Sequence, residues 1–284
     1  MSPWLVHPAA LGLVTLDIAV RAVRLRLLLG RGRAIGFTEA VAVNAWGDAA
    51  SALTPGRLGG EPARFLGLRR HRVATAHGLV VLAAERVVDL SLVALVTVGS
   101  LAFLGERGFR DVAALARRVV SPAFLPWVAA VAVLIVLSGV AAWRLRHRFP
   151  PVVEHSLREA VRETRNLSGV VVAGAGALTA LSMLARVAIL PVLLLAFTPL
   201  AHPLSAFVGS FALIYSQLLL PTPAGVGGVE LGFVAGVAPL LSATDTAALL
   251  VAWRLYSLVI PAGLGGVLLA WDVAVRRLAR RRVE

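Results

Sequence analysis

The chain has 284 residues, of which 58% are hydrophobic, and a formal net charge of +13 in which every basic side chain is arginine. This composition excludes an ordinary water-soluble domain, where about 45–50% of residues are apolar. The absence of cysteine excludes disulfides, thiol catalysis and cysteine-ligated metals. The six histidines show no metal-ligand spacing, and no phosphate-binding P-loop motif is present, so neither a metal nor a cofactor is expected.

The arginines cluster at the ends of long apolar runs, as the positive-inside rule describes for membrane proteins. Nucleic acid is therefore not expected as a partner. An arginine-only composition is typical of a GC-rich genome, and it also suits contact with phosphate, whose oxygens the guanidinium group binds bidentately.

The first part of the chain predicts three membrane-associated elements. An apolar run over 3–20 ends in a string of arginines and should cross from the outside to the cytoplasm. The stretch 35–68 has basic flanks on both sides and a Pro- and Gly-rich centre, so it should enter the membrane and return as two half-helices. Residues 73–104 form a long helix that leads outside, and 106–120 an amphipathic helix at the interface.

The remainder predicts a similar set of elements in the opposite orientation. A helix over 122–143 crosses inward to an Arg-rich cytoplasmic loop at 144–165, and a helix over 168–197 crosses outward. The stretch 204–241 has no flanking arginine and should be re-entrant from the outside. The last helix, 246–271, returns to the cytoplasm, where the arginine-rich C-terminus should lie. No cleavable signal peptide is expected.

We therefore predict an all-α polytopic membrane protein with a single membrane domain over 1–284. Half one covers 1–120, a connecting helix and cytoplasmic loop cover 121–166, and half two covers 167–284. The expected location is the inner, cytoplasmic membrane of the cell.

The two Pro- and Gly-rich segments align without gaps. At a constant offset of 168, Thr54, Pro55, Gly59, Gly60 and Phe65 correspond to Thr222, Pro223, Gly227, Gly228 and Phe233. The same offset relates Arg86 to Arg254, and Arg21 corresponds to Arg186 after a three-residue adjustment. Because the predicted orientations are opposite, the halves form an inverted-topology repeat with two re-entrant broken-helix hairpins. This pattern is typical of alternating-access transporters with a substrate site between the discontinuous helices.

Ionisable residues inside the apolar segments mark the candidate site, because a charged side chain costs about 2.5–3.5 kcal/mol at the bilayer centre. One interpretation is a polar cavity whose arginines hold a phosphate, helped by backbone N–H groups where the half-helices begin. The other is a set of internal ion pairs, such as Asp17–Arg21 and Glu61–Arg64, that only hold helices together. The candidate substrate-binding residues are Arg57, Glu61, Arg64, Arg86, Asp89, Arg186, Gln217, Glu230 and Arg254; the candidate hinge residues are Pro55, Gly56, Gly59, Gly60, Pro223, Gly225, Gly227 and Gly228.

The run TPGRLGGEPAR with the later ERVVD, and the run PTPAGVGGVE with the later WR, resemble the flippase-like transmembrane domain. This domain is the membrane region of lysylphosphatidylglycerol synthase, also called multiple peptide resistance factor, and the resemblance covers nearly the whole chain. It implies translocation of a lipid with a phosphate-containing head group, with a lipid path lined by Arg57, Glu61, Arg64, Arg86, Glu230 and Arg254. Other members are linked to hopanoid lipids or polyprenyl-linked sugars, so the lipid is not fixed.

Three departures from the family pattern qualify what the resemblance implies. The cytoplasmic aminoacyl-transferring domain is not found in this sequence, so lipid aminoacylation by this chain is not expected. Members usually carry one more helix ahead of the one that starts here. Ala224 stands where the second motif usually has Gly.

The leading prediction is a lipid flippase or scramblase-like transporter, not an enzyme, which binds membrane lipids with anionic or phosphate head groups. The lipid could be aminoacylated or polyprenyl-linked. Two alternatives stay open: a membrane partner of a separate lipid synthase or glycosyltransferase, and a small-solute or ion transporter with the same inverted fold. Assembly as a homo-oligomer also stays open.

Overall fold

The regular elements of the computed structural model are helices throughout the residues that it describes, which are 3–30, 35–119, 168–198, 203–218, 220 and 222–281. In chain order they are α1 (Pro3–Leu29), α2 (Phe37–Leu53), α3 (Gly60–Arg70), α4 (Thr75–Val119), α7 (Gly169–Leu194), α8 (Pro203–Ser216), α9 (Gly228–Val237), α10 (Ala243–Arg254), the π-helix η2 (Leu255–Val259) and α11 (Ile260–Arg281). This confirms the all-α prediction. The predicted helix at 122–143 and loop at 144–165 lie outside the described residues.

Three helical stretches among the described residues are long and apolar enough to cross a membrane: Trp4–Leu29, Gly169–Leu194 and Ala243–Val275. The last one combines α10, η2 and part of α11. Large apolar side chains remain exposed on these stretches, for example Trp4 at 87% and Val170 at 83%, as expected where the surroundings are lipid. The chain is therefore a membrane protein.

The first membrane helix is longer than the sequence predicts. We expected the apolar run to end at Val20, but α1 continues through three further arginines to Leu29. The reason is that Arg21 and Arg24 point into the protein, where carboxylates neutralise them.

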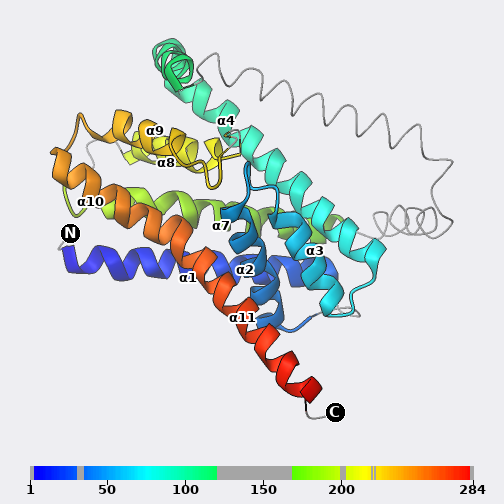
Figure 1. The fold of residues 1–284 in the computed structure, drawn as a ribbon. Coiled ribbons are helices and arrows are strands. Elements are labelled where there is room, and N and C mark those ends of the chain that lie inside the picture. The colour runs from blue at the N-terminus through cyan, green and yellow to red at the C-terminus, as the bar shows by residue number, and fades with distance from the viewer. Residues whose placement is uncertain are drawn as a thin grey trace.

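The centre of the fold is an antiparallel pair formed by α1 and α7, which lie side by side in Figure 1. Asp17 contacts Arg186, Arg24 contacts Thr179, and Leu27 lies against Gly174. The residue numbers fall along α7 as they rise along α1, so the two helices run in opposite directions. These are also the two helices that the Arg21–Arg186 correspondence relates in sequence. Around them, apolar side chains such as Val6, Leu190 and Phe233 form the main core.

Each Pro- and Gly-rich motif interrupts a helix, as predicted. The first lies between α2 and α3 and the second between α8 and α9, and the helices that follow them begin at the equivalent glycines Gly60 and Gly228. The two turns have the same pattern of backbone hydrogen bonds, each formed within its own turn. The amide of Arg57 donates to the Thr54 carbonyl at 3.2 Å, and the amide of Gly225 donates to the Thr222 carbonyl at 3.1 Å.

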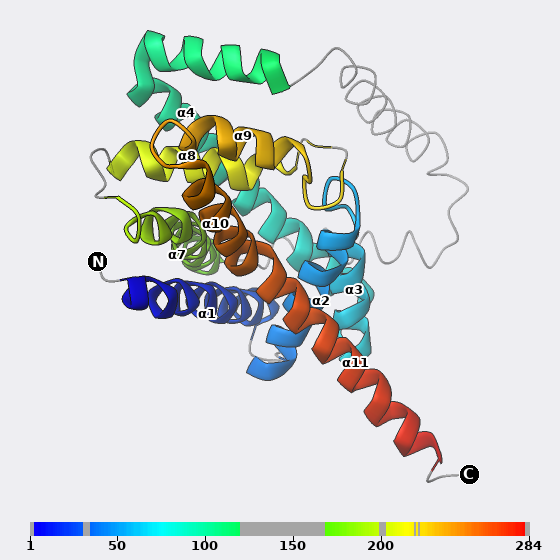
Figure 2. The same ribbon diagram turned by 60° about the vertical axis from the view of Figure 1, so that its left-hand side comes forward.

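The two turns also share an unusual backbone conformation and lie in contact. Gly56 and Arg57 have φ values of 56° and 60°, and the equivalent Ala224 and Gly225 have 52° and 69°. Pro55 forms an isolated antiparallel bridge with Pro223, and Figure 2 shows the two turns side by side. The motifs, far apart in sequence, thus meet at one place in the fold.

Two other features position the site. Helix α11 packs closely on α2, where Gly265 lies directly against the backbone of Ala45. Helix α4 changes direction at Gly105, whose φ of 60° and ψ of −165° are not helical. This kink separates the predicted membrane helix at 73–104 from the predicted interfacial helix at 106–120, so the boundary is confirmed.

Candidate functional site

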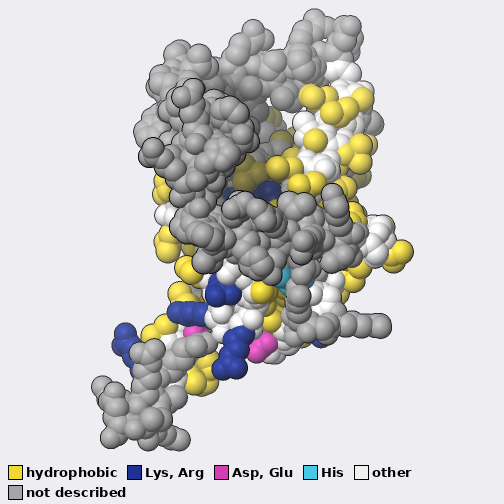
Figure 3. Space-filling view, turned by 90° about the vertical axis from the view of Figure 1, so that its right-hand side faces the viewer, with side chains coloured by type: hydrophobic (Ala, Val, Ile, Leu, Met, Phe, Trp, Pro, Cys, Tyr) yellow, Lys and Arg dark blue, Asp and Glu magenta, His cyan; other side chains and the backbone are white. Residues whose placement is uncertain are grey.

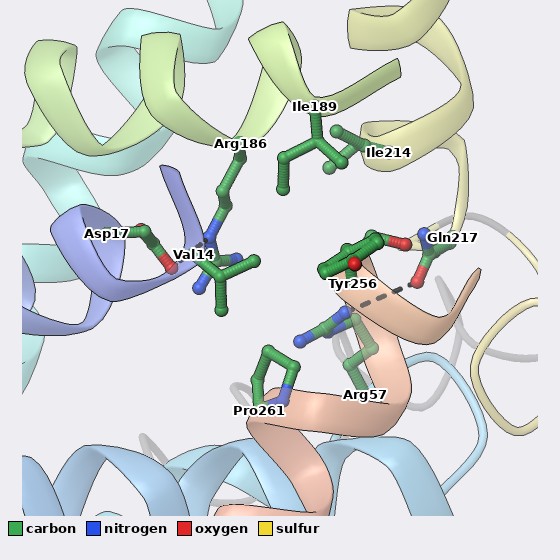
Figure 4. A pocket seen from close by; sticks show the side chains of 10 residues that line it. Val14, Asp17, Arg57, Arg186, Ile189, Ile214, Gln217, Tyr256 and Pro261 are labelled. Atoms are coloured by element: carbon green, nitrogen blue, oxygen red, sulfur yellow. Dashed lines mark hydrogen bonds and ion pairs between the residues drawn. The ribbon is translucent and has the colours of Figure 1, made fainter. Parts of the chain in front are cut away.

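A small, partly open cavity lies beside the point where the two turns meet. Its walls come from α1, α7, the end of α8, the first turn, η2 and α11, as Figure 4 shows. The lining residues are Val14, Asp17, Arg57, Arg186, Ile189, Ile214, Gln217, Tyr256, Ser257 and Pro261. Both halves of the chain therefore contribute to one polar site with apolar walls.

Arg57 enters this cavity from the first turn. Its guanidinium Nη1 donates to the amide oxygen Oε1 of Gln217 at 3.2 Å (Figure 4). Gln217 follows α8 and is only 4% exposed. Arg57 is held at positive φ, which costs a non-glycine residue on the order of 1–2 kcal/mol. The equivalent position in the second turn is Gly225, which has the same backbone conformation and no side chain, so only the first motif presents a cation here.

Arg186 provides the second guanidinium of the cavity. It comes from α7 and donates through Nε to Asp17 Oδ2 at 2.9 Å. Asp17 is only 3% exposed and also accepts the hydroxyl of Ser182, while Arg21 Nε lies 3.2 Å from its carboxylate. The acid in the cavity wall therefore accepts two hydrogen bonds and has a second guanidinium, that of Arg21, within ion-pair distance.

The interior ion pairs of the described residues fall into three groups, and each group contains equal numbers of arginines and acids. These groups are Asp17, Arg21, Asp48 and Arg186; Arg24, Glu61, Arg64, Glu85, Arg86 and Asp89; and Glu230 with Arg254. Arg57 belongs to none of them. Within the described part of the chain, no carboxylate lies within ion-pair distance of its guanidinium, so Arg57 carries the one uncompensated charge of the cavity wall.

The structure brings together three of the predicted substrate-binding residues, Arg57, Arg186 and Gln217. The other six are absent from the cavity wall just described and form ion pairs between helices. Arg64 reaches Glu85, and Asp89 reaches Arg24. That these six residues contact substrate stays a prediction.

Two of these ion pairs are similar in the two halves, although Glu230 lies one position beyond the residue that the offset of 168 relates to Glu61. Arg86 of α4 pairs with Glu61 of α3, and Arg254 of α10 pairs with Glu230 of α9. In each half, the short helix after the turn is therefore joined to the next helix by one Glu–Arg pair. Figure 3 shows arginine and acidic side chains close together in the lower part of one face, with hydrophobic side chains beside them.

The predicted hinge residues lie at the two turns, and three of the glycines, Gly56, Gly225 and Gly227, have positive φ. Gly60 is required for a different reason. A Cβ at this position would collide with the Ser51 hydroxyl of α2, so the glycine allows the two half-helices of the first motif to pack closely.

Sequence reasoning missed several participants. The sequence places Arg24 in the basic flank of the first apolar run, yet its side chain is buried, at 4% exposed, and bridges Glu85 and Asp89. Asp48 interrupts an apolar run, which was a usable signal for an internal pair. Ser257 gave no signal, because its importance comes from η2, where its buried Oγ has no hydrogen-bond partner among the described residues. π-Helical turns occur frequently at functional sites.

The model of the family described as the lysylphosphatidylglycerol synthase TM region matches residues 1–265 of the chain. The match covers most of the sequence, so the chain belongs to this family, whose description associates it with lipid modification in the membrane. No curated protein and no solved structure matches the chain.

Proposed function

We propose that this member of the lysylphosphatidylglycerol synthase transmembrane family moves a lipid with a phosphate-containing head group between the leaflets, and that the head group passes through the cavity at Arg57. The observation that carries the proposal is the unpaired guanidinium. An ionised side chain without a counter-ion is costly inside a membrane protein and marks a functional site. Its planar donors fit phosphate oxygens bidentately.

The chemistry of the cavity wall supports a lipid head group as its occupant. Arg57 and Arg186 supply charged donors and the hydroxyl of Ser257 supplies a neutral one, while the hydroxyl of Tyr256 already lies 3.2 Å from His7 Nδ1. Val14, Ile189 and Ile214 form apolar surface beside them. The head group would exchange its hydration shell for these fixed donors, while the acyl chains remain in the bilayer.

The internal correspondence of the two halves supports an alternating-access mechanism. Helices α1 and α7 are equivalent in sequence and run antiparallel, and the two turns share backbone geometry and meet at Pro55 and Pro223. In inverted-repeat transporters, paired discontinuous helices enclose the substrate site at the repeat interface. We therefore propose that the two helix breaks dip into the bilayer from opposite faces.

The test is translocation in liposomes that contain the purified chain and a lipid with a fluorescent head group. The fraction accessible to an impermeant quencher is followed over time. Arg57→Gln should lower the rate about tenfold or more, as expected when a transition loses upward of ~1.4 kcal/mol of stabilisation. Arg72→Gln is the matched control, because Arg72 also has positive φ but is exposed and lies outside the cavity wall. No translocation by the unmodified chain, or equal rates for it and Arg57→Gln, would refute the proposal.

A second candidate function rests on the family description, which associates the membrane region with lipid modification. The chain would then be the membrane partner of a separate lipid-modifying synthase. Deleting the gene distinguishes the two functions. A partner of the synthase predicts loss of the modified lipid itself, whereas a translocator predicts normal synthesis and accumulation in the inner leaflet.

A further inference from the structure

We infer that the head group accepted by this cavity carries one net negative charge, which is the charge of a single phosphodiester without an ammonium group. The inference rests on the proposed function, because it specifies the substrate class of the same cavity. It follows from how the charges of the cavity wall and its surroundings are balanced.

The first step is the charge available to the ligand. The ion-pair group that reaches the cavity contains two arginines and two aspartates, and the neighbouring groups are balanced in the same way. Arg57 adds one positive charge, and its polar partner Gln217 is neutral. One monoanion therefore makes the occupied site neutral. A phosphomonoester or a pyrophosphate brings further negative charge that no free cation of the wall can compensate, and uncompensated charge is unfavourable at low dielectric.

The second step concerns ammonium groups. Asp17 is the only carboxylate among the lining residues described above. It is 3% exposed, and Arg21, Arg186 and Ser182 already surround it. An ammonium group in this cavity would meet two guanidinium groups and find no free carboxylate. Zwitterionic and aminoacylated head groups are therefore disfavoured relative to the unmodified phosphodiester.

The third step is that the remaining donors of the cavity are uncharged. The Oγ of Ser257 is buried and has no hydrogen-bond partner among the described residues. Gln217 uses its amide oxygen for Arg57, which leaves its NH₂ group to donate. These groups can bind the other oxygens of a phosphodiester without changing the charge that the site prefers.

The first experiment compares head groups in the unmodified chain. Liposomes carry one of four lipids with identical acyl chains, each in trace amount: phosphatidylglycerol, phosphatidylethanolamine, lysyl-phosphatidylglycerol or phosphatidic acid. We expect phosphatidylglycerol to move about tenfold faster than each of the others. Equal rates for all four would refute the charge preference but leave the proposed function standing, and a faster rate for any of the other three would also refute it. No movement of any lipid would refute the proposed function itself.

The second experiment changes the charge of the site. Gln217→Glu places a carboxylate beside Arg57 and makes the empty cavity neutral, so the rate for phosphatidylglycerol should fall about tenfold and phosphatidylethanolamine should become the faster lipid. Gln217→Met is the matched control, because it removes the hydrogen bond without adding charge and should preserve the order of the lipids. An unchanged order in Gln217→Glu would contradict the inference. The ranking in the unmodified chain tests it independently if either variant fails to fold.

Discussion

Pro55 and Pro223 contact each other through a backbone bridge, and they occupy equivalent positions in the two motifs. In the inverted repeat that we propose, equivalent residues that touch would lie close to the axis relating the two halves, and so would the cavity beside them. The two turns differ in charge, because Arg57 stands in one where Gly225 stands in the other. The two motifs therefore present one guanidinium to the cavity and not two.

Replacing Arg57 by glycine should raise stability while abolishing translocation. The change relieves the positive-φ conformation, worth on the order of 1 kcal/mol, and removes an unpaired cation from the membrane interior. Together these gains exceed the loss of the hydrogen bond to Gln217, worth about 1 kcal/mol. The measurements are the melting temperature in detergent and the translocation rate in liposomes.

Arg72→Gly is the matched control for that variant, because Arg72 has a φ of 61° and an exposed side chain. Arg72→Gly should gain only the stabilisation that comes from relieving the positive-φ conformation, and its transport rate should stay the same. A lower melting temperature for Arg57→Gly would instead identify Arg57 as a structural residue and contradict a role in binding.

Gly265→Ala should destabilise the contact between α2 and α11. A Cβ at this position would collide with the backbone carbonyl oxygen of Ala45, and backbone cannot move away as a flexible side chain does. We expect a loss of about 1–3 kcal/mol, seen as a lower melting temperature. The adjacent Gly266→Ala is the control, because a Cβ added there would meet no atom within 4 Å among the described residues. Equal melting temperatures for the two variants would show that α2 and α11 do not pack this closely.

Glu85→Gln should be among the most damaging single changes in the interior. Glu85 is 1% exposed and neutralises both Arg24 and Arg64. Removing its charge leaves a buried excess of positive charge, and breaking a buried pair costs about 3–5 kcal/mol. Glu39→Gln, which changes a carboxylate with a 46% exposed side chain paired with His71, should cost less than about 1 kcal/mol. Similar unfolding midpoints for both variants would argue against the buried network.

The orientation of the two helix breaks can be tested by labelling, because the chain has no cysteine. Single cysteines at Phe37 and Leu204 mark the starts of α2 and α8, and both positions are exposed. An impermeant maleimide applied from one side should label only one of them. Leu278→Cys near the C-terminus should label from the same side as Phe37→Cys. Labelling of Phe37→Cys and Leu204→Cys from the same side would exclude the inverted arrangement.

Much of the helical framework was predictable from local pattern. The apolar runs predicted the three helical stretches that are long and apolar enough to cross a membrane, Trp4–Leu29, Gly169–Leu194 and Ala243–Val275, and the Pro- and Gly-rich motifs predicted the breaks before Gly60 and Gly228. These features depend on short-range chemistry, since proline and glycine act on the backbone wherever they occur. The membrane orientation of each half and the domain division stay predictions.

The composition of the site was less predictable, because it depends on which face of each helix turns inward. Asp17–Arg21 was expected from its i, i+4 spacing and is present at 3.2 Å. The bridge from Arg24 to Glu85 joins residues 61 positions apart, and no local spacing indicates it. For the same reason, sequence grouped Arg57 with Arg86 and Arg254, although the latter two have carboxylate partners and Arg57 has none among the described residues.

The balance of the buried ion pairs has a consequence for how the chain is inserted into the membrane. Arg24 leaves the ribosome well before Glu85, and Asp17 precedes its partner Arg186 by most of the chain length. The first helix must therefore enter the bilayer with charges that later segments will neutralise. We therefore expect the early helix to stay at the insertion machinery until α4 and α7 have been synthesised and can pair with it.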